Sequence, residues 1–167
     1  MGGFYLRAFE LLPGFLKRRI FPLDSSIHSY MLAVKPASAD GLVLDAGSGE
    51  GRFRGYFSDC RYLALDSQVG DSSWDYSNVD VAADLVAIPL PACSADLVLN
   101  IQVLEHVADP QEVVNELFRV LKPGGRLLLT APQGWHEHQQ PNDFFRFTQY
   151  SLTPIFLNAG FLSLIHI

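Results

Sequence analysis

The sequence has no apolar run near the roughly 18–20 residues that a membrane-spanning helix requires, so we expect no stable membrane insertion. Its first residues, Met1 to Tyr5, lack the basic region and small-residue cleavage site of a secretory signal. Cysteine is scarce. The two cysteines, Cys60 and Cys93, lie far apart and form no C-x-x-C motif. This scarcity excludes a disulfide framework and a zinc knuckle, and it predicts a reducing, cytoplasmic location.

Positive charge is also in deficit. The chain has 12 Lys and Arg against 18 Asp and Glu, for a net charge of −6, which argues against nonspecific binding to nucleic acid. With 167 residues, 49% of them hydrophobic, the chain is long enough for one domain with a buried core. We predict an N-terminal helical cap over residues 1–38 and an α/β core over 39–167. Within the cap, two helical pieces over residues 4–21 would cover a sheet edge, form a lid over the substrate site, or touch an anionic membrane surface through the basic cluster at 17–19.

Residues 42–52, LVLDAGSGEGR, organise the rest of the chain. The apolar residues 42–44 predict a short strand that is buried on both faces. Asp45 follows, and then glycine occupies positions 47, 49 and 51. Glycine permits backbone angles that other residues avoid and allows a ligand to approach the main chain closely. A helix starting near Glu50 would direct free N–H groups at the turn, as in a nucleotide-type site.

Strands and helices alternate after this turn. Further strands are predicted at residues 61–65, 79–83, 96–101, 126–130 and from 160 to 167. Asp109-Pro110-Gln111-Glu112 resembles a capping box at the start of a helix, which residues 122–125 end. Other helices are predicted at 26–34, 52–58 and 149–159. The alternation predicts an α/β fold, a doubly wound, mainly parallel sheet with helices on both faces.

Polar residues follow several of these strands. Asp66 ends the second strand about twenty residues after the glycine turn, where a doubly wound sheet places a carboxylate that binds a ribose. The alternative is a loop aspartate that caps the next turn. Asn100 and Gln102 lie at the carboxyl end of the fourth strand, the edge at which open α/β sheets bind ligands.

Taken in order, these segments resemble a class I, Rossmann-like S-adenosylmethionine-dependent methyltransferase of the methyltransferase type 11 group. The resemblance covers roughly residues 40–165. The matching motifs are V-L-D-A-G-S-G-E-G at 43–51, Asp66, D-L…I-P-L-P…S-A-D-L-V at 84–98, V-L-E-H-V at 103–107, D-P…E-L-F-R-V-L-K-P-G-G at 109–125 and G-F at 160–161. Such domains end in a sixth strand and an antiparallel seventh, but this chain stops during the sixth. Either a C-terminal part is missing or the sheet closes differently. A missing last hairpin would expose a sheet edge and allow a homodimer to form through it.

The resemblance implies S-adenosylmethionine as the cofactor, and it implies a role for each matching position. Asp45, Gly47 and Gly49 would surround the methionine part, and Asp66 the ribose. Asp84 would accept from the adenine amino group and Leu85 would pack on the ring. Asn100 and Gln102 would lie near the sulfonium. The complete predicted cofactor set is Asp45, Gly47, Ser48, Gly49, Asp66, Ser67, Asp84, Leu85, Asn100 and Gln102.

Three histidines are candidates for catalysis on the acceptor side. His106 belongs to the E-H-V motif and would act as a general base, or else organise the turn before Asp109. His136 and His138 lie in the loop after the fifth strand. With Glu137 and His106 they offer metal-ligating atoms, but the spacing fixes no third ligand, so no metal is predicted.

Asp143, Phe144, Phe145 and Arg146 lie in the same loop as the last two histidines. These aromatic and charged residues would receive a substrate ring or a carboxylate, or else an Asp–Arg contact anchors the loop. The sequence therefore predicts methyl transfer to a small-molecule or glycan-type acceptor. The alternatives are a non-catalytic S-adenosylmethionine-binding module and a nicotinamide-dependent oxidoreductase. The oxidoreductase fits less well, because G-x-G-x-G departs from the dinucleotide fingerprint G-x-G-x-x-G.

Overall fold

The computed structural model describes residues 13, 16, 19–20, 22–34, 36, 38–70 and 73–164. The chain divides into two compact units, residues 1–35 and 36–167. Helix α3 (Pro22–Ala33) belongs to the first unit and starts four residues before the predicted helix. Most of the predicted helical pieces at 4–21 lie outside the described residues. None of the helices in the described ranges combines the length and the apolar character needed to cross a bilayer.

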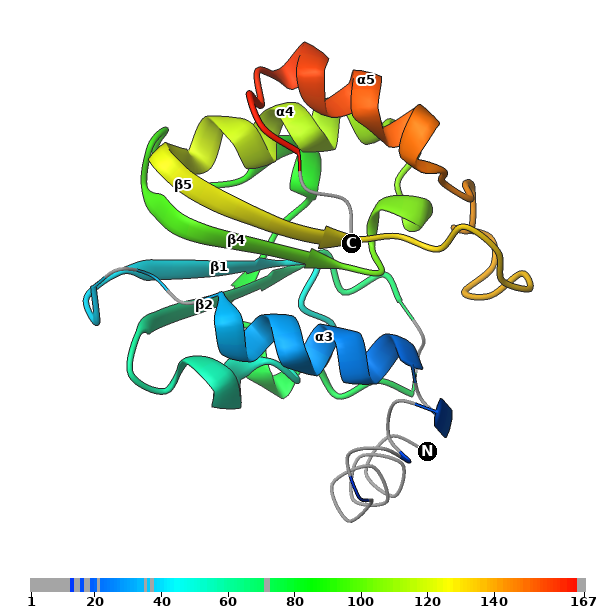
Figure 1. The fold of residues 1–167 in the computed structure, drawn as a ribbon, viewed down its shortest axis with the longest axis horizontal. Helices are drawn as coiled ribbons and strands as arrows, with labels where there is room; N and C mark the ends of the chain where they lie inside the picture. The colour runs from blue at the N-terminus through cyan, green and yellow to red at the C-terminus, as the bar shows by residue number, and fades with distance from the viewer. Residues whose placement is uncertain are drawn as a thin grey trace. The chain divides into compact units, whose positions relative to one another are not determined.

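The second unit contains a five-stranded parallel sheet with strand order β3-β2-β1-β4-β5. In Figure 1 the arrowheads of the labelled strands point the same way, so their carboxyl ends meet at one edge. The prediction of an α/β fold with a mainly parallel sheet is confirmed. The strands are β1 (Leu42–Ala46), β2 (Arg61–Asp66), β3 (Val81–Ala82), β4 (Ala95–Ile101) and β5 (Leu121–Thr130).

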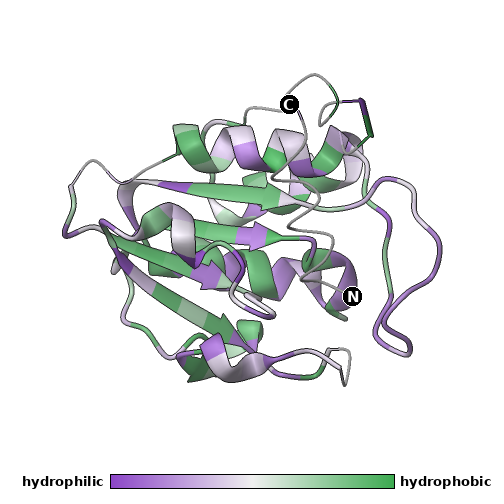
Figure 2. Cartoon of the chain, turned by 90° about the horizontal axis from the view of Figure 1, so that it is seen from below, coloured by the Kyte–Doolittle hydropathy of each residue, from purple (hydrophilic) through white to green (hydrophobic). Residues whose placement is uncertain are grey.

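The central strands are apolar on both faces because both faces are buried. Leu44 pairs in register with Val98, and Val43 pairs with Leu97 on the opposite face. All four side chains are fully buried. Figure 2 shows hydrophobic residues along these strands and hydrophilic ones mainly in the connections.

Helices α4 (Pro110–Val120) and α5 (Gln149–Ala159) lie on the same side of the sheet and contact each other (Figure 1). Asp109 caps α4 as predicted, and its carboxylate accepts from the main-chain N–H groups of Gln111 and Glu112. The apolar stripe of α4 shares one core with Leu44 and Val98 of the sheet; its buried members are Val113, Val114, Leu117 and Val120. Amphipathic spacing thus placed this helix correctly.

Helix α5 has the predicted bounds, although Pro154 lies inside it. Thr148 and Ser151 form a reciprocal capping box at its start, which our sequence analysis did not identify. Gly160 ends the helix with a left-handed backbone, φ 109°. A Cβ there would lie 2.9 Å from the ring of Phe118, so glycine suits this close approach.

The structure corrects the helix predicted at 52–58. Only a four-residue 3-10 turn, η1 (Arg54–Phe57), forms there. Gly51 has a φ of +71°, which is incompatible with a right-handed helix, so the helix expected to start near Glu50 is interrupted there. The ring of Phe57 stacks on Tyr62 at 6.0 Å, on the sheet face opposite α4 and α5. Strand β3 is likewise shorter than predicted, with two residues instead of 79–83.

The sixth strand predicted from residue 160 is wrong for the residues that the structure describes. Residues 161–164 have no regular structure, and 165–167 lie outside the described ranges. Phe161 packs its ring against Phe118 and Phe156, with centroids 5.0 and 5.4 Å apart. Leu162 is 99% exposed. Aromatic packing on the helices therefore holds this segment where the sequence predicted sheet pairing.

Candidate functional site

The glycine turn follows β1 and is hydrogen-bonded to the carboxyl end of the neighbouring strand β2. The main-chain N–H groups of Gly47 and Ser48 both donate to the carbonyl oxygen of Leu65, at 2.8 and 3.0 Å. Gly47 has φ +84°, and a Cβ there would lie 2.6 Å from both terminal methyl groups of Val103. Both the backbone angle and the space require glycine at this position. The close approach observed at Gly47 is made by Val103, and the approach of a ligand to this turn stays a prediction.

Asp66 links the end of β2 to the same turn. Its Oδ2 accepts from the N–H of Gly49 at 2.8 Å, and its Oδ1 accepts from the N–H of Gln68 at 2.7 Å. The side chain is buried, whereas the neighbouring Ser67 is exposed. The carboxylate thus faces the turn, as a ribose ligand would, and it also caps the following bend. The structure shows the capping role that the sequence left open for Asp66, and the ribose contact stays a prediction.

Two polar atoms beside the turn have no hydrogen-bond partner among the described residues. Asn100 is fully buried, and its Nδ2 donates to the carbonyl oxygen of Ala46 at 2.9 Å. That bond fixes the amide orientation and leaves the Asn100 Oδ1 unsatisfied, and the buried Oγ of Ser48 is unsatisfied as well. Buried polar groups in native proteins are nearly always paired, so two orphans at one sheet edge indicate a site for a polar ligand.

Asp45 lies on the other face of β1 from Leu44. It is buried, and it accepts a hydrogen bond from the hydroxyl of Tyr62. Burial raises the pKa of Asp45 to about 7. This carboxylate therefore has a protein partner already, and its expected role toward the methionine part of a cofactor stays a prediction.

The remaining predicted cofactor residues occupy the neighbouring strand ends. Asp84 is exposed, and its Oδ1 accepts from the N–H of Val86, which caps the short turn η3 (Leu85–Ala87). Leu85 is 5% exposed and belongs to the hydrophobic core. Gln102 has φ 58°, and its Nε2 donates to Thr130 Oγ1 at 3.2 Å. The structure thus gives each side chain a local function, and their ligand contacts stay predictions.

The loop between β2 and β3 contributes a residue that our sequence analysis missed. The ring of Trp74 lies 3.3 Å from where a Cβ on Gly49 would stand. Glu50 joins this loop to the turn: its Oε1 accepts from the N–H of Asp75, and its carbonyl oxygen accepts from Asn78 Nδ2. The available signal was a tryptophan in an otherwise polar segment, because such a ring seldom lies in a loop without a packing partner.

The candidate catalytic histidines gather around the turn η4 (Leu104–His106) and the loop after β5. The rings of His106 and His138 meet edge-on with centroids 4.6 Å apart, and His136 lies 6.4 Å from His138. The Nδ1 of His106 lies 2.5 Å from the carbonyl oxygen of Asn142. Burial lowers the pKa of His106. Neutral imidazole is therefore the form that this site favours.

Asp143 and Arg146 anchor the loop that carries two of these histidines. Arg146 binds both carboxylate oxygens of Asp143, at 2.7 and 2.9 Å, and also donates to the carbonyl oxygens of Trp135 and His136. The guanidinium holds the pKa of Asp143 well below its usual range. Of the two roles that the sequence left open for this pair, the structure shows the Asp–Arg contact that anchors the loop. Exposed rings beside it are those of Trp135, Phe144 and Phe145.

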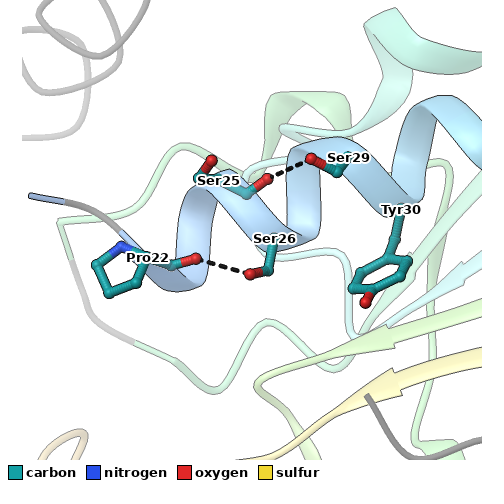
Figure 3. A pocket seen from close by; sticks show the side chains of 5 residues that line it. All are labelled: Pro22, Ser25, Ser26, Ser29 and Tyr30. Atoms are coloured by element: carbon teal, nitrogen blue, oxygen red, sulfur yellow. Dashed lines mark hydrogen bonds between the residues drawn. The ribbon is translucent and has the colours of Figure 1, made fainter. Parts of the chain in front are cut away.

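A pocket on α3 contains none of the predicted residues. It is lined by Pro22, Ser25, Ser26, Ser29 and Tyr30 (Figure 3). The Oγ atoms of Ser26 and Ser29 donate to main-chain carbonyl oxygens one helical turn earlier, at 2.8 and 2.9 Å. These hydroxyls are therefore engaged within the helix, and the sheet edge remains the stronger candidate site.

A parallel sheet, a glycine turn after its first strand and an acid after its second define a Rossmann-like nucleotide-binding domain. Residues 44–129, just over half of the chain, match the family model described as a methyltransferase domain. The chain belongs to this family, and the resemblance identified from the sequence is confirmed.

Curated relatives carry related names. The chain is 35% identical over 127 residues to a "Probable S-adenosylmethionine-dependent methyltransferase" of Mycolicibacterium smegmatis, a match that covers 72% of this chain and 49% of that protein. It is 37% identical over 107 residues to a malonyl-[acyl-carrier protein] O-methyltransferase of Enterobacter lignolyticus, covering 60% of this chain and 43% of that protein. The chain thus spans about half the length, or less, of these relatives.

Solved structures share the fold. The YcgJ protein of Bacillus subtilis superposes with a TM-score of 0.64 at 19% identity, over 78% of this chain and 66% of that chain. A phosphoethanolamine N-methyltransferase of Haemonchus contortus, solved with S-adenosylhomocysteine, superposes with a TM-score of 0.60 at 18% identity. That match covers 80% of this chain and 37% of the other. At such identities the likeness extends to the fold alone.

Proposed function

We propose that the chain binds S-adenosylmethionine at the carboxyl ends of β1, β2 and β4 and transfers its methyl group to a small-molecule or glycan-type acceptor. Family membership supports the reaction class. One structural observation carries the cofactor assignment: the Oδ1 of Asn100 and the Oγ of Ser48 are buried beside the glycine turn without a partner among the described residues.

The donor set suits this cofactor. S-adenosylmethionine presents a cationic sulfonium, an ammonium group and two ribose hydroxyls, all of which are attracted by oxygen atoms. Asn100 Oδ1 and Ser48 Oγ would accept from its polar hydrogens, and the carboxylate of Asp66 would accept from the ribose. The missing Cβ atoms of Gly47 and Gly49 let Val103 and the Trp74 ring pack close to the turn, which holds it in place beside Ser48 and Asn100. The residues present therefore fit the group.

When bound, the cofactor supplies an already activated methyl group, so the protein's main contribution is positioning. Holding the acceptor in line with the methyl–sulfur bond can provide roughly 7–11 kcal/mol of the barrier reduction. If the acceptor must lose a proton, His106 is the candidate base. Its Nδ1 faces the carbonyl oxygen of Asn142 and so carries the hydrogen, which leaves Nε2 to accept a proton. His136 and His138 would orient the acceptor.

The acceptor class is inferred from the loop at residues 132–148. Its exposed rings, Trp135, Phe144 and Phe145, suit contact with a planar or partly apolar group. A sugar ring also stacks on such side chains. One relative is named for a malonyl-[acyl-carrier protein] acceptor and one structural neighbour for phosphoethanolamine, so we assign a class of molecule and no individual compound.

Calorimetry on the full chain tests the cofactor assignment. S-adenosylhomocysteine should bind with one equivalent, and Asn100→Ala should weaken that binding at least about tenfold, because it removes a buried acceptor. Asn115→Ala is the matched control, since Asn115 is exposed on α4. Binding of NAD without S-adenosylhomocysteine would favour the oxidoreductase instead. Transfer from labelled S-adenosylmethionine to an acceptor panel then separates an enzyme from a non-catalytic binding module.

We also propose that the sheet edge at β5 can pair with a second copy of the chain. Among the described residues β5 hydrogen-bonds in the sheet only with β4, which supports an available edge. Sedimentation of the full chain over a concentration series tests this. A monomer at all concentrations would contradict it.

A further inference from the structure

A second cluster of ligand-type atoms lies at the end of β4. Glu105, His106 and His138 each place one candidate ligand atom within 4.8 Å of the others. Glu105 and His106 come from η4, and His138 comes from the loop after β5. The loop anchored by Arg146 thus brings a third side chain to a pair that is adjacent in sequence.

The buried, unpaired carboxylate of Glu105 is the feature that indicates a ligand. Its side chain is fully buried, and neither carboxylate oxygen has a hydrogen-bond partner among the described residues. Its Oε1 lies 3.8 Å from His106 Nε2, which is also buried and unsatisfied within the described chain. An unpaired buried carboxylate is costly, and proteins satisfy such groups with a cation, a proton or a metal. The carboxylate is directed into the cluster.

The two imidazoles are oriented as metal-ligating histidines usually are. A carbonyl oxygen can only accept, so the Nδ1 of His106 donates to Asn142 and its lone pair is on Nε2. The Nδ1 of His138 lies 3.2 Å from the carbonyl oxygen of His136 and 3.5 Å from Asp143 Oδ2. Metal-bound histidines typically direct their second nitrogen at a carbonyl or carboxylate in this way.

We propose that Glu105, His106 and His138 bind a divalent transition-metal ion, with Zn²⁺ as the reference ion. Two imidazoles and one carboxylate form a ligand set found at catalytic zinc sites, which keep a fourth position open. Mg²⁺ is disfavoured, because it prefers oxygen ligands.

The geometry requires a small closure. Tetrahedral zinc bonds of about 2.0–2.2 Å separate ligand atoms by roughly 3.4 Å, whereas the atoms here spread up to 4.8 Å. Rotation of His138 supplies the movement, because it lies on a loop and its side chain is 26% exposed. Glu105 and His106 are held more firmly, at 0% and 12% exposure.

The proposed metal site does not rest on the methyl transfer proposed above. It does, however, affect the role of His106. A metal ion and a proton would use the same Nε2 lone pair, so a loaded site replaces the general base suggested above. A bound ion could instead lower the pKa of an acceptor hydroxyl.

Metal binding itself is the test. The full chain, stripped with a chelator, is titrated with Zn²⁺ by calorimetry and with Co²⁺ by visible absorption. One equivalent should bind, and Co²⁺ should give the intense bands of a low-coordinate site. His138→Ala should weaken binding at least about 100-fold, because loss of a group that merely orients a ligand already costs roughly 10–100-fold. Glu105→Gln should weaken it as well.

His136→Ala is the matched control, because His136 lies in the same loop but outside the cluster. It should leave the Co²⁺ spectrum and stoichiometry unchanged. The proposal is overturned if no ion binds with one-to-one stoichiometry, or if His136→Ala removes binding as effectively as His138→Ala. Circular dichroism of each variant establishes that it is folded. Loss of metal binding with intact S-adenosylhomocysteine binding separates this proposal from the proposed function.

Discussion

The carboxylate of Asp66 accepts a hydrogen bond from the N–H of Gly49 at 2.8 Å, which ties the end of β2 to the turn that follows β1. This bond is buried and joins residues that are 17 positions apart in the chain. The side chain predicted to hold the ribose therefore also fixes the glycine turn. In the proposed cofactor site, one residue would therefore determine both turn geometry and ligand affinity.

Asp66→Ala should lower both stability and affinity. It leaves the N–H groups of Gly49 and Gln68 without their acceptors, at an expected cost of about 1–3 kcal/mol in the free energy of unfolding. Urea denaturation measures that cost, and calorimetry should show weaker binding of S-adenosylhomocysteine. Asp66→Asn is the control, since its amide oxygen can still accept from one N–H. Equal losses in both variants would contradict this account and point to charge alone.

Gly47→Ala should destabilise the chain through two separable effects. The backbone angle costs about 1 kcal/mol or more for a residue with a Cβ, and the new methyl would stand 2.6 Å from Val103. Gly124→Ala isolates the first effect, because Gly124 has φ +79° and a Cβ added there would meet nothing within 4 Å. Denaturation should show a larger loss for Gly47→Ala, which Val103→Ala partly reverses. Equal losses at both glycines would exclude the contact with Val103.

Asp45 should make stability fall as pH rises from about 4 to about 7. Its pKa is raised to about 7 by burial, so the folded chain keeps a proton that the unfolded chain releases near pH 4. The stabilisation is complete below pH 4 and is lost by about pH 7, with an upper bound of about 4 kcal/mol. Asp45→Asn mimics the protonated form and still accepts from Tyr62.

Urea denaturation of Asp45→Asn across this pH range should show a flatter profile than that of the parent chain. Burial raises the pKa of Glu105 to about 7 too, so part of the slope remains in the variant. Asp40→Asn, at an exposed position, controls for the change in net charge. A profile for Asp45→Asn that matches the parent would mean that Asp45 is ionised in the folded chain.

Arg146→Lys should loosen the loop at 132–148 without affecting cofactor affinity. Lysine keeps the charge, but it cannot bind both oxygens of Asp143 and two carbonyl oxygens at once. Hydrogen exchange should become faster around His136 and His138, and methyl transfer should slow. Arg61→Lys, exposed at the start of β2, is the control. Unchanged exchange in the loop would show that Arg146 is not its anchor.

Local patterns predicted the parts of the fold that local forces determine. The apolar run at 42–44, the Asp109 cap and the stripe on α4 each have a reason within a few residues, and each was found. The prediction of a sixth strand was wrong because the position of Phe161 depends on its packing against rings from two helices. The predicted helix start near Glu50 was wrong because the sequence does not show that Gly51 takes a left-handed angle.

The candidate site likewise contains positions that the sequence could predict and contacts that it could not. Strand-end positions such as Asp66 and Asn100 follow from parallel topology, so their approach to the turn was predictable. The Tyr62–Asp45 bond and the burial of Glu105 were not, because each depends on which face of a strand or turn is covered. Trp74 was missed because a contact between a loop residue and a turn far away in the sequence leaves no local pattern.

The chain has two tryptophans, one beside the glycine turn and one in the loop that carries His136 and His138. The ring of Trp74 adjoins Gly49, whereas Trp135 is 64% exposed, with its ring 4.9 Å from that of His136. The protein therefore carries a natural optical reporter for each compartment. Replacing either indole by phenylalanine would leave a single emitter, so arrival of the nucleoside and occupancy of the histidine loop could be followed separately in an unlabelled protein.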